Sequence, residues 1–337
     1  MMTQSAYPRR DFLAAALAGG PMLASLGRAA APPVRSGVRK ALIAITLDLE
    51  MSRNFPAWDD THWDYEKGNL DAETKKYSVE AARRVKAHGG TVHFFAVGRV
   101  LEQENVRWLK DLVVAGHRVG NHTYDHVNVK ATRPEDIQFR FNRAPWLIDG
   151  KAPRDIIREN IRLTSTAMKM RLGTNPAGFR TPGGFSDGLA DRPDVQRMLQ
   201  DLGFNWVSSK YPAHPMGKPG EKPTPAVLDG IVKAQAHSQP FVYSKGLIEV
   251  PMSPISDISA FRGGRWKLEW FLEAVRQSVE WAIEHRRVFD FLAHPSCLYV
   301  TDPKFRAIEL ICSLVKKAGD RAAFADLDTI AGRARPT

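Results

Sequence analysis

The sequence predicts an α/β fold in which parallel strands form the centre and helices pack outside. Segments of strand character alternate with segments of helical character along most of the chain. Residues 41–47 form an apolar run rich in Ile and Leu, as expected of a strand that is buried on both faces. Polar and titratable residues occur at or just after several of the strands, where parallel sheets carry their chemistry.

The first half of the predicted fold runs from this strand to a long helix. Residues 72–88 have helical spacing and end before Gly89 and Gly90, which are a helix stop signal. The other elements expected here are strands at residues 91–97 and 117–121 and helices at residues 103–115, 134–141 and 153–171.

The second half continues the alternation. We expect strands at residues 177–179, 204–208, 241–250, 288–293 and 322–325, and helices at residues 193–202, 267–285 and 304–318. Residues 52–69 and 209–225 lack periodicity, so they are predicted to be loops that could form the rim of a cleft. Trp58, Trp63 and Trp266 are weak candidates for stacking on sugar rings.

Residues 1–31 are predicted to be a twin-arginine-type export signal. The pair Arg9 and Arg10 precedes an Ala-, Leu- and Gly-rich apolar stretch that ends near Leu26. A basic start, a short apolar stretch and small residues before a break are typical of such signals. We therefore expect an exported protein, periplasmic or extracellular. No linker or internal repeat divides the remainder, which predicts a single catalytic domain over residues 32–337.

The composition limits the classes of molecule that the chain is expected to bind. The chain has 48 Lys and Arg against 37 Asp and Glu, a net charge of +11. An export signal and scattered basic residues argue against nucleic acid, but a cationic surface could attract anionic cell-wall polymer. No apolar run reaches the roughly 18 residues of a stable membrane span. Cys297 and Cys312 allow one bridge, although two buried small apolar side chains are the favoured interpretation.

A pair of histidines follows the strand expected at residues 117–121. His122 and His126 are four residues apart, so both can face one cation from a loop or a helical turn. A surface or capping pair is the alternative for two isolated histidines. His117, at the start of the strand, is expected to be structural.

Two carboxylates follow the first strand. Asp48 and Glu50 are separated by Leu49, and residues two apart on an extended chain point to the same side. A carboxylate at the end of an apolar strand is costly unless it is bonded or functional. Both carboxylates are therefore expected to face a common cleft.

An arginine and a further histidine complete the set of candidate site residues. Arg180 is followed by Pro182, Gly183 and Gly184, and the glycines indicate close approach of the backbone to a ligand. His294 directly follows the strand expected at residues 288–293. The alternatives are a surface salt bridge for Arg180 and a buried structural histidine for His294.

Together these segments resemble the polysaccharide deacetylase family (carbohydrate esterase family 4). The resemblance rests on the His-Thr-x-x-His pattern of His122 and His126, the Arg-x-Pro pattern of Arg180 and Pro182, and the Leu-x-His pattern that ends at His294. It implies a distorted (β/α) barrel with parallel strands. It also implies a metal-dependent hydrolase that removes N-acetyl or O-acetyl groups from a polysaccharide or glycan.

The resemblance also implies a role for each site residue. Asp48 is the catalytic base, Arg180 holds that base by charge-assisted hydrogen bonds, and His294 is the general acid. His122 and His126 are metal ligands. The implied cofactor is a divalent metal, zinc in the first place, with other divalent ions open.

The chain departs from the family at the first motif, which is usually Thr-Phe-Asp-Asp-Gly. Leu49 stands at the position of the second Asp, and Glu50 stands at that of the Gly. Glu50 is our candidate for the third metal ligand. If Glu50 points elsewhere, either Asp48 itself binds the metal or the site is poor in metal.

Two assignments stay open at this point. Asp257 and Asp290 are both candidates for the residue that orients His294. Trp206 either lines an acyl pocket or belongs to the core. Two other functions are also weighed: a metal-independent cyclic-amide hydrolase resembling allantoinase, favoured by the lost second Asp, and an exported glycan-binding protein without activity.

Overall fold

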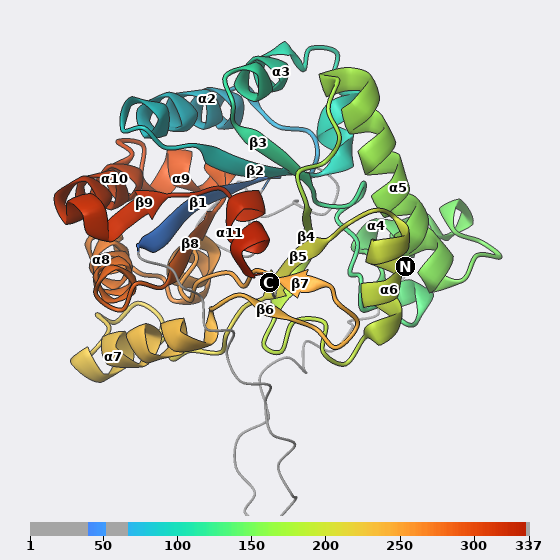
Figure 1. Ribbon diagram of the computed structural model, residues 1–337. Coiled ribbons are helices and arrows are strands. Elements are labelled where there is room, and N and C mark those ends of the chain that lie inside the picture. The colour runs from blue at the N-terminus through green and yellow to red at the C-terminus, as the bar shows by residue number, and fades with distance from the viewer. Residues whose placement is uncertain (1–39, 52–66, 335–337) are drawn as a thin grey trace, which may run out of the picture. The chain divides into compact units, whose positions relative to one another are not determined.

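The fold is described from a computed structural model, for residues 40–51 and 67–334 (Figure 1). The export signal predicted over residues 1–31 lies outside the described residues, as do Trp58 and Trp63. Within the described ranges, no helix combines the length and the apolar character needed to cross a membrane.

A sheet of nearly all parallel strands forms the centre of the fold. Its order is β6-β7-β5-β4-β3-β2-β1-β8, with β9 paired to the beginning of β1, and only the β6–β7 pairing is antiparallel. The strands are β1 (Ala41–Leu49), β2 (Val92–Ala96), β3 (Arg118–Asn121), β4 (Phe179–Phe185), β5 (Trp206–Lys210), β6 (Phe241–Val242), β7 (Ile248–Glu249), β8 (Val288–Ala293) and β9 (Ala322–Phe324). Every residue of β1 is buried, which explains its apolar sequence.

The sheet curls into an incomplete barrel. After β7 the chain stays extended, and the Met252 N–H donates to the Lys210 carbonyl at 2.9 Å. One residue later, the Ser253 N–H donates to the Asp290 carbonyl in β8 at 3.2 Å. This irregular segment links the two sides of the curled sheet, and the predicted distorted (β/α) barrel is confirmed.

Helices cover the outside of the curled sheet (Figure 1). They are α2 (Ala72–Ala87), α3 (Arg107–Val114), α5 (Pro153–Leu172), α6 (Pro193–Asp201), α7 (Pro225–Ala234), α8 (Leu268–Glu284) and α10 (Arg306–Ala318). Local sequence sets several of their ends. Asp71 caps α2 by accepting from the Thr74 N–H at 2.7 Å, and α5 ends at Gly173, whose φ of 73° is left-handed.

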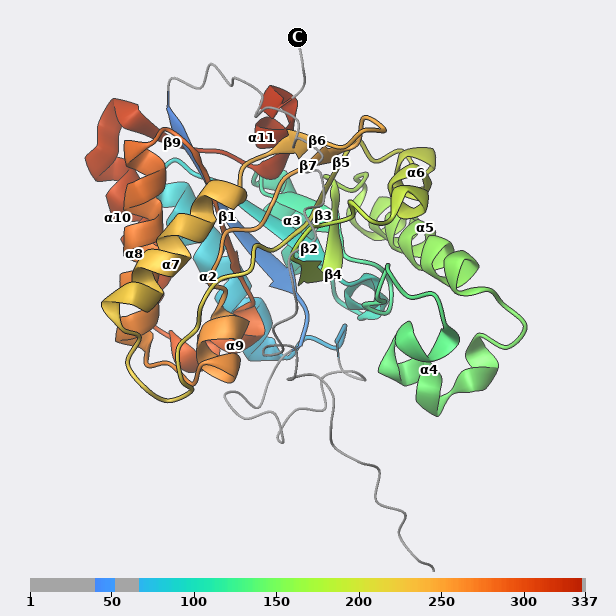
Figure 2. The same cartoon turned by 90° about the horizontal axis from the view of Figure 1, so that it is seen from below.

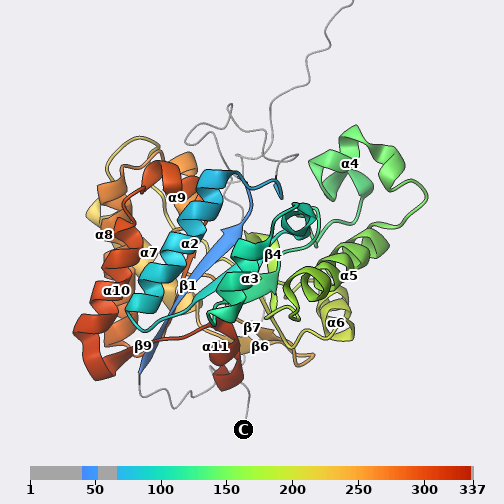
Figure 3. The same ribbon diagram turned by 90° about the horizontal axis from the view of Figure 1, so that it is seen from above.

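The two ends of the barrel carry different elements. At the carboxyl end of β1 lie α9 (Pro295–Thr301) and, further out, α4 (Phe139–Arg143), whereas α11 (Leu327–Ala334) lies at the opposite end (Figures 2 and 3). The short 3-10 helix η2 (Gly98–Glu102) follows β2 directly. The loops that follow β1, β2, β3 and β8 lie at the end of the barrel where these parallel strands have their carboxyl ends.

Three sequence-based predictions of elements were wrong. The strand expected over residues 241–250 is two short strands joined by a turn, because Gly246 adopts a φ of 87° and its N–H bonds the Tyr243 carbonyl. The helix expected over residues 134–141 is broken into η3 (Pro134–Asp136) and α4. The strand expected at residues 177–179 begins only at Phe179, which places Arg180 within β4.

Several residues whose role the sequence left open are structural. Trp206 is buried, and its Nε1 donates to Asp328 Oδ1 in α11 at 2.8 Å, so it belongs to the core. Trp266 is also buried in the core, which removes it as a sugar-stacking candidate. Cys297 and Cys312 are buried, and no disulfide bridge joins them.

Candidate active site

The two carboxylates of the first strand face the same side of the sheet. Asp48 lies in β1 and Glu50 follows it, and both are 3% exposed, while Leu49 between them packs in the core. Strand alternation produces this arrangement. Asp48 Oδ2 lies 3.8 Å from His122 Nε2, and Glu50 Oε2 lies 3.5 Å from the same atom.

The histidines lie on a tight loop after β3. Thr123 and His126 both have left-handed φ values, 58° and 59°, which are costly for residues other than glycine. Local bonds hold the loop: Asn121 Oδ1 accepts from the Thr123 N–H at 2.8 Å, and Thr123 Oγ1 accepts from the Val127 N–H at 2.9 Å. The resulting turn brings His126 Nε2 to 2.6 Å from Glu50 Oε2.

A glycine in η2 lets the histidine loop pack closely against its neighbours. The Gly98 N–H donates to the Thr123 carbonyl at 2.8 Å. A Cβ at Gly98 would lie 2.3 Å from Tyr124 Cδ2 and 2.6 Å from Thr164 Oγ1. A larger residue would therefore push the loop away from the carboxylates.

Hydrogen bonds and burial set the protonation of both imidazoles. His122 Nδ1 lies 3.0 Å from the Arg180 carbonyl, which can only accept, so Nδ1 carries the proton and Nε2 offers a lone pair to the site. Burial lowers the pKa of His126 to about 4, so this imidazole is neutral at pH 7. Neutral imidazoles are the form that binds a metal.

The donor set of Glu50, His122 and His126 fits a divalent cation. One donor atom from each lies within 4.8 Å of the others. Glu50 Oε2 is buried and lies 2.6 Å from His126 Nε2 and 3.5 Å from His122 Nε2. Its close approach to a neutral imidazole nitrogen is stable only if a proton or a cation lies between them. Two imidazoles and one carboxylate are a known set for catalytic zinc.

Glu50 is ionised in this setting. Burial alone would raise its pKa, but His126 and the Lys67 ammonium hold that pKa well below its usual range. The carboxylate is therefore available as an anion at any pH near neutrality.

Arg180 connects Asp48 to a second buried carboxylate. Its Nη1 donates to Asp48 Oδ1 at 3.0 Å and its Nη2 to Asp290 Oδ2 at 2.6 Å. Thr46 Oγ1 and Ser208 Oγ accept from the same guanidinium at 2.8 and 3.2 Å. This network fixes one oxygen of Asp48 and leaves Oδ2 turned towards the histidines.

His294 lies beside the two carboxylates and is oriented by Asp257. His294 Nδ1 donates to Asp257 Oδ1 at 2.9 Å, and the His294 N–H donates to Oδ2 at 2.7 Å. His294 Nε2 lies 4.0 Å from Asp48 Oδ2 and 3.7 Å from Glu50 Oε1. Of the two partners left open by sequence, Asp257 holds the imidazole, while Asp290 binds Arg180.

The charge of Asp257 changes the titration of His294. Burial alone would lower the pKa of His294, but the Asp257 carboxylate raises it above its ordinary value. The imidazolium therefore persists to a higher pH than that of an ordinary histidine.

Lys67 is a site residue that sequence analysis missed. Lys67 is 1% exposed, and its ammonium forms an ion pair with Glu50 Oε1. Lys67 belongs to the aperiodic segment expected to be a loop, and no motif or spacing marked it. Only the burial requirement of Glu50, a charge that needs a partner, could have indicated a nearby cation.

The glycines after Arg180 act differently from our expectation. Gly183 adopts a φ of 75°, which favours glycine, but a Cβ there would meet nothing within 4 Å. A Cβ at Gly184 would lie 2.4 Å from Tyr211 Cβ. The close approach in this part of the chain is therefore to a protein side chain.

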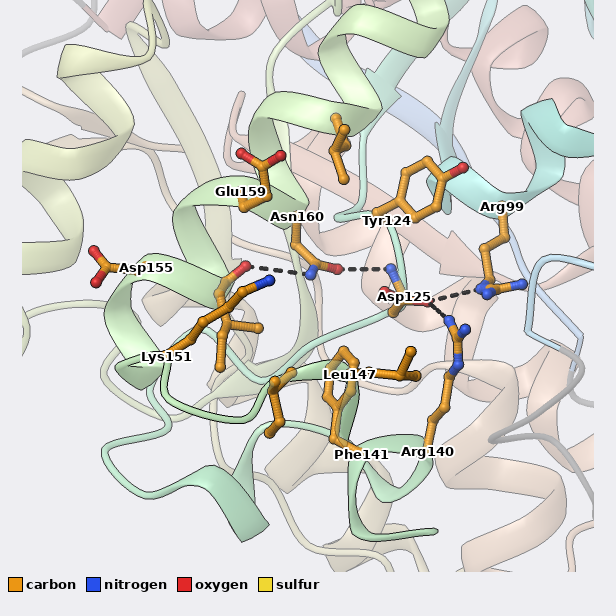
Figure 4. A pocket seen from close by; sticks show the side chains of 13 residues that line it. Arg99, Tyr124, Asp125, Arg140, Phe141, Leu147, Lys151, Asp155, Glu159 and Asn160 are labelled. Atoms are coloured by element: carbon orange, nitrogen blue, oxygen red, sulfur yellow. Dashed lines mark hydrogen bonds and ion pairs between the residues drawn. The ribbon is translucent and has the colours of Figure 1, made fainter. Parts of the chain in front are cut away.

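A cavity of about 570 Å³ lies beside the histidine loop (Figure 4). Asp125, next to His126, accepts from Arg99 Nε at 2.7 Å and from Arg140 Nη1 through the same oxygen. The Asp125 N–H donates to Asn160 Oδ1 in α5 at 2.8 Å. Figure 4 shows these residues among those that line the cavity, so residues that fix the histidine loop also line it.

The sequence matches one family model, described as polysaccharide deacetylase, over residues 64–205. This range includes His122, His126 and Arg180, whereas Glu50 and His294 lie outside it. Among curated proteins, none matches the chain.

Solved structures share the fold at low sequence identity. A putative polysaccharide deacetylase from Mycobacterium smegmatis superposes with a TM-score of 0.57 at 16% identity, covering 90% of this chain and 93% of that one. A probable polysaccharide deacetylase from Pseudomonas aeruginosa PAO1 gives 0.58 at 14% identity, covering 88% and 91%. The Puue allantoinase gives 0.56 at 12% identity, covering 91% and 94%.

Proposed function

Because part of the chain matches the polysaccharide deacetylase family model and the fold is shared with solved structures of that description, we propose that the chain is a metal-dependent hydrolase that removes acetyl groups from a glycan. The proposal rests on the convergence of Glu50, His122 and His126 with Asp48 and His294 at one edge of the sheet. Three donors for a cation lie beside a carboxylate and an imidazole that are left for proton transfer. Hydrolysis of an amide or ester needs these groups.

Each protein group then has its own role in the proposed reaction. A divalent metal held by Glu50, His122 and His126 would activate a water molecule and polarise the acetyl carbonyl. Asp48 removes the proton of the attacking water with Oδ2, since Arg180 holds Oδ1. His294 gives a proton from Nε2 to the leaving nitrogen or oxygen. The products are acetate and a free amine or hydroxyl group.

Zinc is the proposed metal because two imidazoles and one carboxylate suit it, although the same donors also bind other divalent ions. The proposed location is outside the cytoplasm, on the strength of the arginine pair and apolar stretch within residues 1–31. The cavity beside Asp125 is the proposed position for the part of the glycan that does not react.

Metal content and activity should fall together in His126→Ala. Elemental analysis of the purified protein should find near-stoichiometric divalent metal, because three buried donors bind it. His126→Ala should lose both the metal and the release of acetate from an acetylated glycan. An active, metal-free wild-type protein would contradict the proposal.

The same samples can separate the competing functions. Acetate release is measured with an N-acetylated and an O-acetylated glycan, and ring opening with a cyclic amide. Ring opening without acetate release, in a metal-free protein, would favour the allantoinase-like function. Glycan binding without any turnover would favour a binding protein.

Asp257→Asn should shift the alkaline limb of the pH profile to lower pH. A general acid acts in its protonated form, so activity falls as pH rises through the pKa of His294. Asp257 raises that pKa, and its neutral replacement leaves burial to lower it. We expect the profile of kcat against pH to show an earlier decline.

Asp201→Asn is the matched control, because Asp201 is exposed on α6 and remote from His294 in sequence and contacts. Its pH profile should equal that of the wild type. An unchanged alkaline limb in Asp257→Asn would show that His294 is not the group that titrates in this range.

A further inference from the structure

In the buried ion pair between Lys67 and Glu50, the two oxygens of the carboxylate face different partners. Oε1 contacts the Lys67 ammonium, whereas Oε2 lies 2.6 Å from His126 Nε2 and 3.5 Å from His122 Nε2. Only Oε2 therefore faces the two imidazoles. The lysine side chain is 2% exposed and that of Glu50 is 4% exposed, so water does not weaken the pair.

The backbone fixes Lys67 at the end of β1. The Met51 N–H donates to the Lys67 carbonyl at 2.9 Å. The next residue, Gly68, packs so closely that a Cβ there would lie 2.1 Å from Arg99 Cβ. The backbone of Lys67 is thus held near Glu50 by two contacts that do not involve the histidines.

A lysine next to a metal site is unfavourable on electrostatic grounds alone. An ammonium repels a divalent cation, and burial strengthens this repulsion because the effective dielectric is low. A simple structural pair would place the lysine on a carboxylate away from the histidines. Its position on one oxygen of Glu50 therefore points to an effect on how Glu50 binds the metal.

We propose that Lys67 is a positioning residue that limits Glu50 to one ligating oxygen. A carboxylate can bind a cation through one oxygen or two. With Oε1 held by the ammonium, only Oε2 is available, which keeps coordination positions open for water and the acetyl carbonyl. The proposal rests on the metal-dependent function proposed above.

Cobalt(II) substitution tests the proposal without an activity assay, because four-coordinate cobalt absorbs visible light more strongly than five- or six-coordinate cobalt. Lys67→Met should weaken the visible bands, since Glu50 can then use both oxygens. It should also bind cobalt about tenfold more tightly in competition with a chelator, since a repelling charge is gone. Lys67→Arg, which keeps charge and donors, should retain the wild-type bands.

Lys76→Met is the matched control, because Lys76 is an exposed lysine of α2. It should leave spectrum and affinity unchanged. If Lys67→Met does not fold, Lys67→Gln decides by the same two measurements.

The possible failures can be told apart. If the wild type binds no cobalt, the metal-dependent function itself is wrong, and the role of Lys67 is wrong with it. If the wild type binds cobalt and the neutral variant keeps its bands and affinity, only the role of Lys67 is wrong.

Discussion

Asp48→Asn should lower turnover by about 10²–10⁴-fold, the usual contribution of a general base. Asparagine has nearly the same shape, and its carbonyl oxygen can still accept from Arg180 Nη1, as Asp48 Oδ1 does at 3.0 Å. It cannot remove a proton from water at Oδ2, however. We expect kcat for acetate release to fall while the fold is kept.

Metal content distinguishes a base from a ligand. If Glu50, His122 and His126 supply the ligands, Asp48→Asn should keep near-wild-type metal content by elemental analysis. Loss of metal together with activity would identify Asp48 as a ligand, and full activity would remove it as the base.

Asp302→Asn is a useful comparison, because Asp302 is also buried and its carboxylate accepts from the backbone N–H groups of Arg306 and Ala307, at 2.9 and 2.8 Å. This variant should lower stability without a selective loss of turnover.

Much of the fold could be predicted because strong local signals agreed with it. Residues 41–45 of the buried strand β1 are all apolar, and α5 begins at a proline and is followed by a glycine. Weak signals failed where tertiary contacts decide the structure. The turn at Gly246 splits a segment of strand character, and the short helices α9 and α11 have few residues in which a pattern could appear.

The candidate site also contains some residues that the sequence could predict and others that it could not. Asp48 and Glu50 were predictable as partners because alternation along one strand fixes their common side. The choice of Asp257 over Asp290 for His294 was not predictable, because it depends on the irregular segment after β7. Lys67 could not be found either, since its contact with Glu50 joins residues 17 apart across a segment without periodicity.

Arg180→Met should destabilise the protein by about 3–5 kcal/mol, the usual effect of removing one partner from a buried ion pair. Arg180 is fully buried, stacks over the Phe95 ring at 4.3 Å and bridges Asp48 and Asp290. Without it, two carboxylates remain in the core with no guanidinium between them. Denaturant unfolding at pH 7 measures the change in unfolding free energy, and acetate release should fall because Asp48 loses its orientation.

The loss of unfolding free energy in Arg180→Met should depend on pH. Burial raises the pKa of Asp290 to about 6 even though Arg180 lowers it, so in Arg180→Met that pKa should rise further. A carboxyl group with a raised pKa stabilises the fold at low pH and loses this contribution as pH rises through the raised value. The deficit relative to the wild type should therefore be largest above the raised pKa of the variant and shrink as the pH falls through that value to about 6.

A second substitution separates stability from activity. Asp290→Asn, added to Arg180→Met, removes one of the two unpaired carboxylates and should restore part of the stability at pH 7. It cannot restore turnover, because Asp48 still lacks the bond that turns Oδ2 to the histidines. Recovery of both together would mean that Arg180 acts only through the packing of the core, whereas recovery of stability alone supports its place in orienting the base.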